Sequence, residues 1–189
     1  MRTAAIILSG GQGSRVGFAE KGLLEFQGEP LIGRKLSQLQ PLFNDILIVV
    51  NKPALYQSYS DRATMVVDDL PYQGPLRGLY CGMQAKESEW YFVTAVDMPF
   101  FVPALVDYFS ACMADHHAIV AKLEAGIEPL FGFYHRQIMP RMAALLQTPT
   151  AGLRHLLETV NTQYISESAV KVVDPELQTF YNINTQEDY

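Results

Sequence analysis

Short apolar runs alternate with segments of helical periodicity along this chain, and the alternation predicts its class of fold. Near-continuous apolar runs of strand length recur in the first half, at Ala4–Leu8, Asp45–Val50, Thr64–Val67 and Trp90–Val96. Such runs are typical of strands that are buried on both faces, as in a largely parallel sheet covered by helices. Helical segments are expected between the runs, at Pro30–Pro41, Pro53–Tyr59 and Leu76–Ala85.

The pattern weakens in the second half but continues. Helices are expected at Pro103–Met113, 137–146 and 152–160. Strands are expected at Ala118–Leu123, Pro129–Tyr134, Gln163–Ser166, Val170–Val173 and Thr179–Ile183. We therefore predict a single domain over residues 1–189 with a doubly wound, Rossmann-like α/β fold. Its mostly parallel sheet would have about seven strands, with helices on both faces.

Composition narrows the class of protein. The 189 residues are 49% hydrophobic and 18% charged, which indicates a globular chain with a substantial core. The net charge of −6 argues against a general nucleic-acid binder, which needs a basic surface. The two cysteines are not spaced as a metal or disulfide motif. No apolar run approaches the length of a signal peptide core or a membrane span, so we expect a cytoplasmic protein without membrane partners.

The loop that follows the first strand is the strongest local signal. It contains Gly10, Gly11, Gly13 and Gly17 and carries two cations, Arg15 and Lys21. Glycines let the backbone approach a phosphate closely, free N–H groups point at the anion, and cations neutralise the remaining charge. The alternative is a tight surface turn with two solvated cations.

Two familiar phosphate-binding loops do not fit this segment. A P-loop requires a lysine directly after its second glycine, whereas Arg15 stands where that glycine belongs. A Rossmann dinucleotide fingerprint requires a third glycine where Val16 stands, and an acidic residue at the end of the second strand, where Asn51 stands.

Polar residues follow each of the apolar runs of the first half. Asn51 follows the second run, Asp68 and Asp69 the third, and Asp97 the fourth. Ligands of open α/β sheets bind at the carboxyl ends of the strands, so these groups are expected to share one crevice with the glycine loop. Asp97 could hold Mg²⁺, which bridges phosphate oxygens, or could cap the turn before the next helix. Asp68 or Asp69 could accept the paired N–H donors of guanine, or could be acidic because the turn is solvated.

The segment LSGGQGSRVGFAEKGL, Leu8–Leu23, resembles the nucleotidyltransferase signature L-x-G-G-x-x-x-R-x-G-x-x-x-K-x-L. With ILIVVN, VVDDLPYQGPLRG, VTAVDMPF and YNINTQED, the chain is similar to molybdenum cofactor guanylyltransferases over nearly its whole length. The resemblance implies the nucleotide-diphospho-sugar transferase fold. It also implies transfer of GMP from GTP to molybdenum-molybdopterin with release of pyrophosphate, in the presence of Mg²⁺. Brief contacts with molybdoenzymes or other cofactor-biosynthesis proteins are compatible with such a role.

The same resemblance implies roles for individual residues. Arg15 and Lys21 would bind the triphosphate, and Asp97 would be the Mg²⁺ ligand. Substrate contacts would come from both ends of the chain, namely Leu8, Ser9, Gly10, Gly11, Lys21, Asn51, Asp69, Asp97, Asn182 and Asn184. Small departures from the family pattern are Ser9, where Ala is usual, and Glu20, where Asp is usual.

The C-terminal half is expected to bind the pterin. Asn182 and Asn184 would share one face of a last strand and lie on the pterin or metal side, although a turn also favours Asn. Glu128, before Pro129, falls where the resemblance places a residue near the acceptor. Two rival functions stay open: a related nucleotidyltransferase that uses CTP or a sugar phosphate, and a non-catalytic protein that binds GTP or the cofactor.

Overall fold

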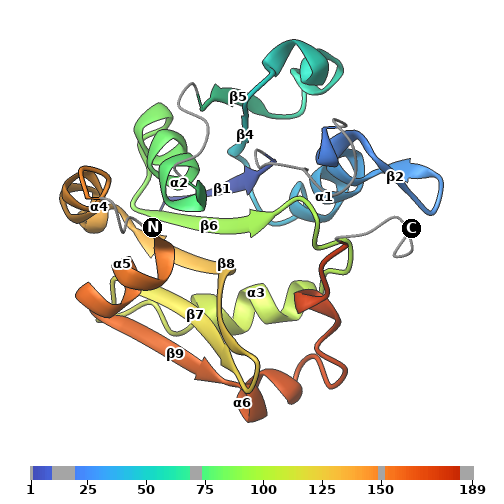
Figure 1. Cartoon of the computed structure of the whole chain (residues 1–189). Helices are drawn as coiled ribbons and strands as arrows, with labels where there is room; N and C mark the ends of the chain where they lie inside the picture. The colour runs from blue at the N-terminus through green and yellow to red at the C-terminus, as the bar shows by residue number, and fades with distance from the viewer. Residues whose placement is uncertain (1, 10–19, 69–73, 149–151, 184–189) are drawn as a thin grey trace.

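A seven-stranded sheet forms the centre of the computed structural model, which describes residues 2–9, 20–68, 74–148 and 152–183 (Figure 1). The strand order across this sheet is β5-β4-β1-β6-β8-β7-β9. The strands are β1 (Thr3–Leu8), β4 (Ile46–Val50), β5 (Thr64–Val67), β6 (Trp90–Ala95), β7 (Ala118–Leu123), β8 (Gly126–His135) and β9 (Thr162–Ser166).

The sheet is mostly parallel, as predicted. Strands β5, β4, β1 and β6 pair in parallel, and β9 pairs in parallel with β7. Only β8, among these strands, runs against its neighbours β6 and β7. The residues of β1 pair with β4 on one side and β6 on the other, so β1 is a central strand.

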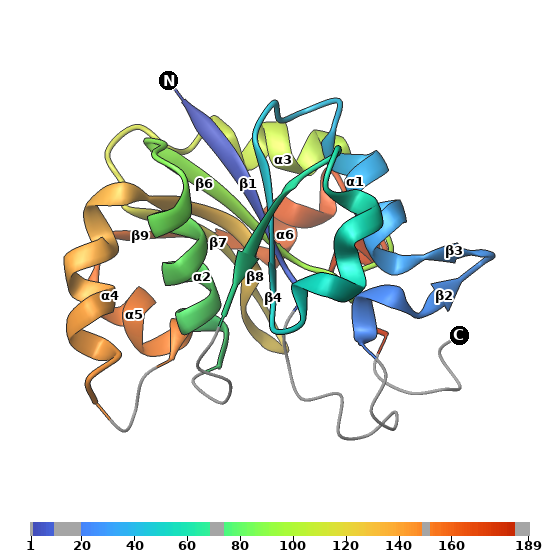
Figure 2. The ribbon, with the colours of Figure 1, turned by 90° about the horizontal axis from the view of Figure 1, so that it is seen from above.

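Helices cover both faces of the sheet (Figure 2). The α-helices are α1 (Leu31–Leu39), α2 (Gly74–Ala85), α3 (Pro103–Ser110), α4 (Met139–Leu145), α5 (Leu153–Thr159) and α6 (Glu167–Lys171). Short 3-10 helices are η1 (Lys21–Leu23), η2 (Pro53–Tyr59), η3 (Arg136–Ile138) and η4 (Gln178–Phe180). Apolar residues of α1, α3 and α6 pack on one face, and those of α2, α4 and α5 pack on the other.

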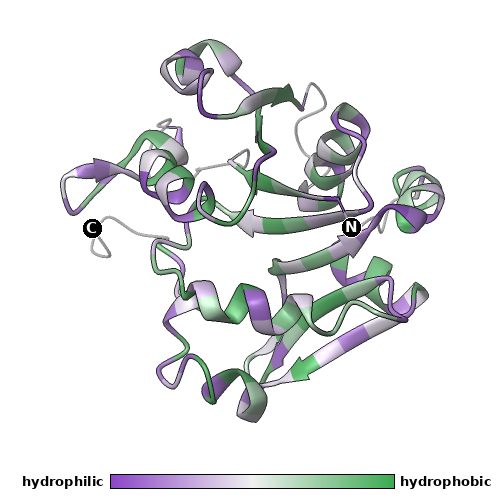
Figure 3. Ribbon diagram, turned by 180° about the vertical axis from the view of Figure 1, so that it is seen from behind, coloured by the Kyte–Doolittle hydropathy of each residue, from purple (hydrophilic) through white to green (hydrophobic). Residues whose placement is uncertain are grey.

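The alternation of side chains along β1 shows why its buried part, from Ala4 to Leu8, has no polar position. Ala5 and Ile7 join the core under α1 and α3, whereas Ala4, Ile6 and Leu8 join the core under α2. Successive side chains of a strand point to opposite faces, so a strand with two buried faces needs apolar residues throughout. Figure 3 shows the same distribution, with the central strands mostly green and purple stretches concentrated in the helices and peripheral connections.

The order of the strands defines where a ligand should bind. From β1 the chain passes to β4 and β5 on one side of β1, and then crosses through α2 to β6 on its other side. The direction of winding therefore reverses between β1 and β6. Open α/β sheets bind ligands at the carboxyl ends of the strands beside such a reversal.

Two predicted strands were wrong. Residues 170–173 lie in and after helix α6, whose N-cap Ser166 accepts a hydrogen bond from the Ala169 amide. Residues 179–183 contain the end of η4, because the buried Asp174 carboxylate accepts the amides of Gln178 and Thr179 and turns the chain. Short apolar runs do not distinguish strand from helix, and here side-chain caps decided the outcome.

The segment before α1 forms a small hairpin. Strands β2 (Glu25–Phe26) and β3 (Glu29–Pro30) pair antiparallel around a turn whose residues Gln27 and Gly28 have φ of 54° and 81°. Two successive positive φ values are typical of the tight turns that join hairpin strands.

We expect Phe92→Ala to lower the free energy of unfolding by about 3–5 kcal/mol. Phe92 is fully buried in β6, and its ring lies 5.3 Å from Phe43, 5.1 Å from Phe131 and 5.2 Å from Phe133 between ring centroids. Chemical denaturation measures the loss. Tyr108→Ala, at a side chain that is 39% exposed, is the control and should change stability much less.

Candidate functional site

An ion pair joins two distant segments at the carboxyl end of the central strands. The Lys21 ammonium lies 2.5 Å from Oδ2 of Asp97, and both side chains are about four-fifths buried. Lys21 begins η1, and Asp97 lies in the turn that follows β6. The pair therefore stands at the position where the order of the strands predicts a ligand.

The position of Lys21 depends on the close packing of the next residue. A Cβ atom on Gly22 would lie 2.4 Å from Oγ of Ser9 and 2.8 Å from the hydroxyl of Tyr56. These two side chains are buried and hydrogen-bonded to each other at 2.9 Å. Burial raises the pKa of Tyr56 to about 12, so the phenol stays protonated at neutral pH. Glycine at position 22 thus lets η1 pack directly against the end of β1.

The Asp97 carboxylate has one oxygen available for a cation. Among the described residues, Oδ1 of Asp97 is buried and has no hydrogen-bond partner, although Oδ2 contacts Lys21. No group of three or more His, Cys, Asp or Glu side chains that could hold a metal occurs in the described part of the chain. Magnesium is often held by one or two carboxylates, with waters and substrate phosphates as further ligands. A carboxylate with one oxygen that has no hydrogen-bond partner fits that ion.

The ends of β1 and β4 lie beside this pair. The amide of Ser9 donates to the carbonyl of Val49, and the carbonyl of Leu8 accepts from the amide of Val96. Leu8 and Ser9 thereby lie against the segment that leads to Asp97. The Ser9 amide and the Leu8 carbonyl thus already form hydrogen bonds within the fold. The base contact predicted for these two residues would have to use their other backbone groups or a second lone pair of the carbonyl.

The residues that follow β4 and β5 are linked to each other by a hydrogen bond from a side chain to the backbone. The amide nitrogen of Asn51 donates to the carbonyl of Asp68 at 2.9 Å. The carboxylate of Asp68 lies 3.7 Å from Nε of Arg77 in helix α2. Of the two acidic residues at the end of β5, Asp68 thus faces a cation of the protein itself, whereas the base contact was predicted for Asp69.

The C-terminal segment reaches the same place. The amide of Ile183 donates to the carbonyl of Asp97 at 2.9 Å, and Asn182 directly precedes Ile183 in the sequence. Asn182 is not in a strand, and its side-chain amide donates to the carbonyl of Phe180. The shared strand face predicted for the two asparagines was wrong for Asn182. The segment lies beside Asp97, and its role on the pterin or metal side stays a prediction.

The structure brings together Leu8, Ser9, Lys21, Asp97 and the segment of Asn182, while Asn51 lies at the end of the adjoining strand β4. The other predicted site residues lie outside the described residues, and they are Gly10, Gly11, Arg15, Asp69 and Asn184. Their roles stay predictions.

A hollow of about 450 Å³ adjoins the Asp97 turn on the C-terminal side. Phe100 and Tyr181 line it, with ring centroids 5.9 Å apart, and Glu128 lies in the same wall. Burial raises the pKa of Glu128, although Arg154 opposes the shift. The hollow combines flat aromatic rings with a half-buried carboxylate within the part of the chain expected to bind the acceptor.

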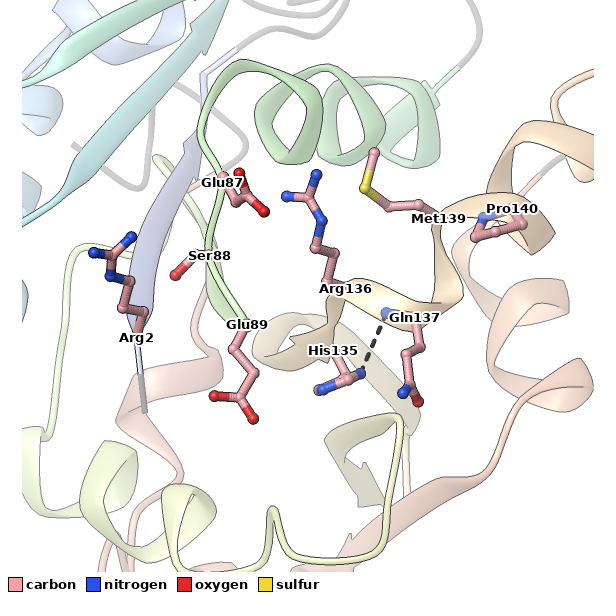
Figure 4. Close-up of a pocket in the computed structure, with 9 residues that line it drawn as sticks. All are labelled: Arg2, Glu87, Ser88, Glu89, His135, Arg136, Gln137, Met139 and Pro140. Carbon is pink, nitrogen blue, oxygen red and sulfur yellow. Dashed lines mark hydrogen bonds between the residues drawn. The ribbon is translucent and has the colours of Figure 1, made fainter.

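A second hollow, of about 830 Å³, lies at the opposite ends of the strands (Figure 4). Its wall includes Arg2, Glu89 and Arg136, which stand before β1, before β6 and after β8. In a parallel sheet, the amino ends of the strands face away from the carboxyl ends. This hollow is therefore separate from the Lys21–Asp97 pair.

Two buried residues near the Lys21–Asp97 pair were not singled out from the sequence, namely Tyr56 and Lys35. Tyr56 lies in the short helix η2, and nothing in the sequence of that helix predicts its contact with Ser9. Lys35 did carry a signal, because it falls within the apolar stripe Leu31, Ile32, Leu36 and Leu39 of helix α1. A lysine at a core position is rare unless its ammonium has a partner.

Open α/β sheets bind ligands where the strand order reverses, and in this chain a lysine and a carboxylate meet at that point, as suits a phosphate and its cation. The sequence model of the MobA-like NTP transferase domain matches residues 5–167, and the chain is thus a nucleotidyltransferase. It belongs to the molybdenum cofactor guanylyltransferase family.

Curated relatives agree with this assignment, and a solved structure shares the fold. The chain is 33% identical to a probable molybdenum cofactor guanylyltransferase of Methanosarcina mazei, over 98% of this chain and 87% of the relative. It is 30% identical to the molybdenum cofactor guanylyltransferase of Vibrio atlanticus, over 99% of this chain and 93% of the relative. The crystal structure of molybdopterin-guanine dinucleotide biosynthesis protein A from Archaeoglobus fulgidus shares the fold, with a TM-score of 0.82. That comparison has 24% identity and covers 98% of this chain and 94% of the other.

The described part of the chain contains no helix long and apolar enough to cross a membrane.

We expect Gly22→Ala to destabilise the protein by about 1–3 kcal/mol, because the new methyl group would overlap the Ser9 and Tyr56 side chains. Combining it with Ser9→Ala should recover part of the loss, since the nearest overlapping atom is then absent. Chemical denaturation of both single variants and the double variant measures the coupling. Gly152→Ala is the matched control, because nothing lies within 4 Å of its added Cβ. Strictly additive losses at positions 9 and 22 would contradict the packing described.

Proposed function

We propose that this protein transfers GMP from GTP to molybdenum-molybdopterin, which yields the guanine dinucleotide form of the molybdenum cofactor and pyrophosphate. The observation that carries the proposal is the meeting of Lys21 and Asp97 at the reversal point of the sheet. The membership of the chain in its family supports the choice of substrates. The product would pass to molybdoenzymes or other cofactor-biosynthesis proteins through brief contacts.

In the proposed reaction, a phosphate oxygen of the acceptor attacks the α-phosphorus of GTP. A new P–O bond forms, the bond between the α-phosphorus and the β-phosphate oxygen breaks, and pyrophosphate leaves with that electron pair. The acceptor phosphate is already an anion at neutral pH, so the protein need not supply a nucleophile. Positioning and charge stabilisation then account for the catalysis.

Lys21 and Asp97 would exchange partners when substrate binds. In the described state the ammonium and the carboxylate neutralise each other. With Mg²⁺ and GTP present, Asp97 would hold the ion and Lys21 would turn its charge to the triphosphate, with Arg15 assisting. Bound Mg²⁺ neutralises phosphate charge and withdraws electron density from the reacting phosphorus. Because Lys21 already lies in the site, its charge needs little reorganisation as the leaving pyrophosphate develops.

The remaining predicted contacts divide between nucleotide and acceptor. Leu8, Ser9, Gly10 and Gly11 with Asn51 and Asp69 would hold the nucleotide, and Asp69 would pair with the guanine edge. Asn182, Asn184 and Glu128 would face the acceptor, and the aromatic hollow beside the Asp97 turn offers room for a planar pterin.

A nucleotide panel tests the proposed reaction. With Mg²⁺ and a molybdenum-loaded molybdopterin acceptor, we expect release of pyrophosphate with GTP and little with CTP, ATP or UTP. Release with CTP instead would retain the mechanism and contradict the guanine assignment. GTP binding without any release, in the presence of a competent acceptor, would indicate a binding protein.

We expect Asp97→Asn and Lys21→Met each to lower the rate of pyrophosphate release by on the order of 10²–10³-fold, the usual effect of losing one electrostatic stabiliser. The Lys86–Asp45 ion pair supplies matched controls, because its side chains lie 2.7 Å apart but are 44% and 49% exposed. Lys86→Met and Asp45→Asn should leave the rate within about twofold of the wild-type rate. Full activity of Asp97→Asn would refute the assigned role of this carboxylate.

A further inference from the structure

We propose that Lys35 and Gln38 of helix α1 are positioning residues, which hold the turn after β6 so that the Asp97 carboxylate faces its substrate. The inference rests on the proposed function, because it assumes that Asp97 takes part in the transfer. Neither side chain belongs to the set of substrate contacts, and both act through the backbone of the turn.

The turn after β6 is held by donors from outside it. Three successive carbonyls, those of Asp97, Met98 and Pro99, accept hydrogen bonds from the Ile183 amide, the Lys35 ammonium and the Gln38 side-chain amide. The distances are 2.9 Å, 2.6 Å and 2.9 Å in that order. These carbonyls follow the end of the strand, where buried backbone groups need partners other than the sheet. Each bond restricts one peptide plane, and together they define the direction of the chain at Asp97.

Helix α1 presents the two side-chain donors from one face. Lys35 and Gln38 are three residues apart, and residues at this spacing are neighbours on a helix surface. Their acceptors, Met98 and Pro99, are also adjacent in sequence. Two neighbouring side chains of one helix thus bind two consecutive carbonyls of the turn, and a single rigid helix restrains both peptide groups.

The burial of Lys35 shows that this contact is costly. Its side chain is 1% exposed, and no carboxylate of the described residues forms an ion pair with it. Its ammonium lies 5.3 Å from the centre of the Phe101 ring, within the same turn region. Burial lowers the pKa of Lys35 to about 7, and the negative charge of Asp97 opposes the shift. An apolar residue of similar length would fill the space without this penalty, so the stability of the core does not explain the lysine.

The test combines stability, metal binding and rate in the full-length protein. Lys35→Met keeps the length of the side chain and removes the donor. We expect its melting temperature to equal or exceed that of the wild type, while kcat for pyrophosphate release falls by on the order of 10–100-fold. Binding of Mn²⁺ in the presence of GTP, measured by electron paramagnetic resonance, should weaken by about tenfold or more through the displaced carboxylate. Binding of GTP without a divalent ion should change little.

A double-mutant cycle separates positioning from general damage. Combined with Asp97→Asn, the loss caused by Lys35→Met should disappear, because the group it positions is already removed. Arg34→Met is the matched control, since Arg34 neighbours Lys35 in α1 but donates to Gln27 of the hairpin. Gln38→Met removes the second donor, whose side chain is only partly buried. This variant replaces Lys35→Met in the test if Lys35→Met does not fold.

The outcomes distinguish the two proposals. If Asp97→Asn is inactive while Lys35→Met and Gln38→Met are both fully active, the positioning inference is overturned and the proposed function stands. A loss of rate that tracks a lower melting temperature, or that persists in the Asp97→Asn background, would also overturn it by showing a structural role. An active Asp97→Asn enzyme would refute the proposed function before the question of positioning arises.

Discussion

The central strand β1 is the constraint on which the rest of this molecule depends. It is paired on both edges and covered on both faces, so its side chains from Ala4 to Leu8 are all buried in the interior. Because β1 fixes the register of β4 and β6, it also fixes where those strands end. The ends of β1 and β6 lie side by side, with Leu8 bonded to Val96, and the next residue after Val96 is the carboxylate of the site. The position of Asp97 therefore follows from the burial and pairing of the apolar strands β1 and β6.

The ion pair of Lys21 and Asp97 affects both the stability of the protein and its proposed ability to bind a metal-bound nucleotide. Two partly buried charges are tolerable because they satisfy each other in the absence of ligand. Each is also suited to a different part of a metal-bound nucleotide, the lysine to phosphate and the carboxylate to the cation. The same contact therefore limits the cost of keeping charges in the site and keeps both groups within reach of their proposed partners.

The sequence predicted most of the fold because the strands of a buried parallel sheet have a distinctive composition. The runs that end at Leu8, Val50 and Val67 were all found as strands, and Asp97 was placed correctly after the fourth run. The errors lie where side-chain caps decide the path, as at Ser166 and Asp174, because the apolar pattern there is too short to choose between strand and helix. Contacts such as Ser9 with Tyr56 could not be predicted, since they depend on how segments 47 residues apart meet in space.

The hydrogen bond from Ile183 to Asp97 has a consequence for how this protein is made. A ribosome synthesises the chain from its N-terminus, so β1, β4, β5 and β6 can emerge and pair well before residue 183 exists. The peptide group of Asp97 lacks one of its donors throughout that interval, because the donor arrives from the far side of β7, β8 and β9. The strands of the first half can thus pair early, but the Asp97 turn gains this hydrogen bond only after the second half has been translated.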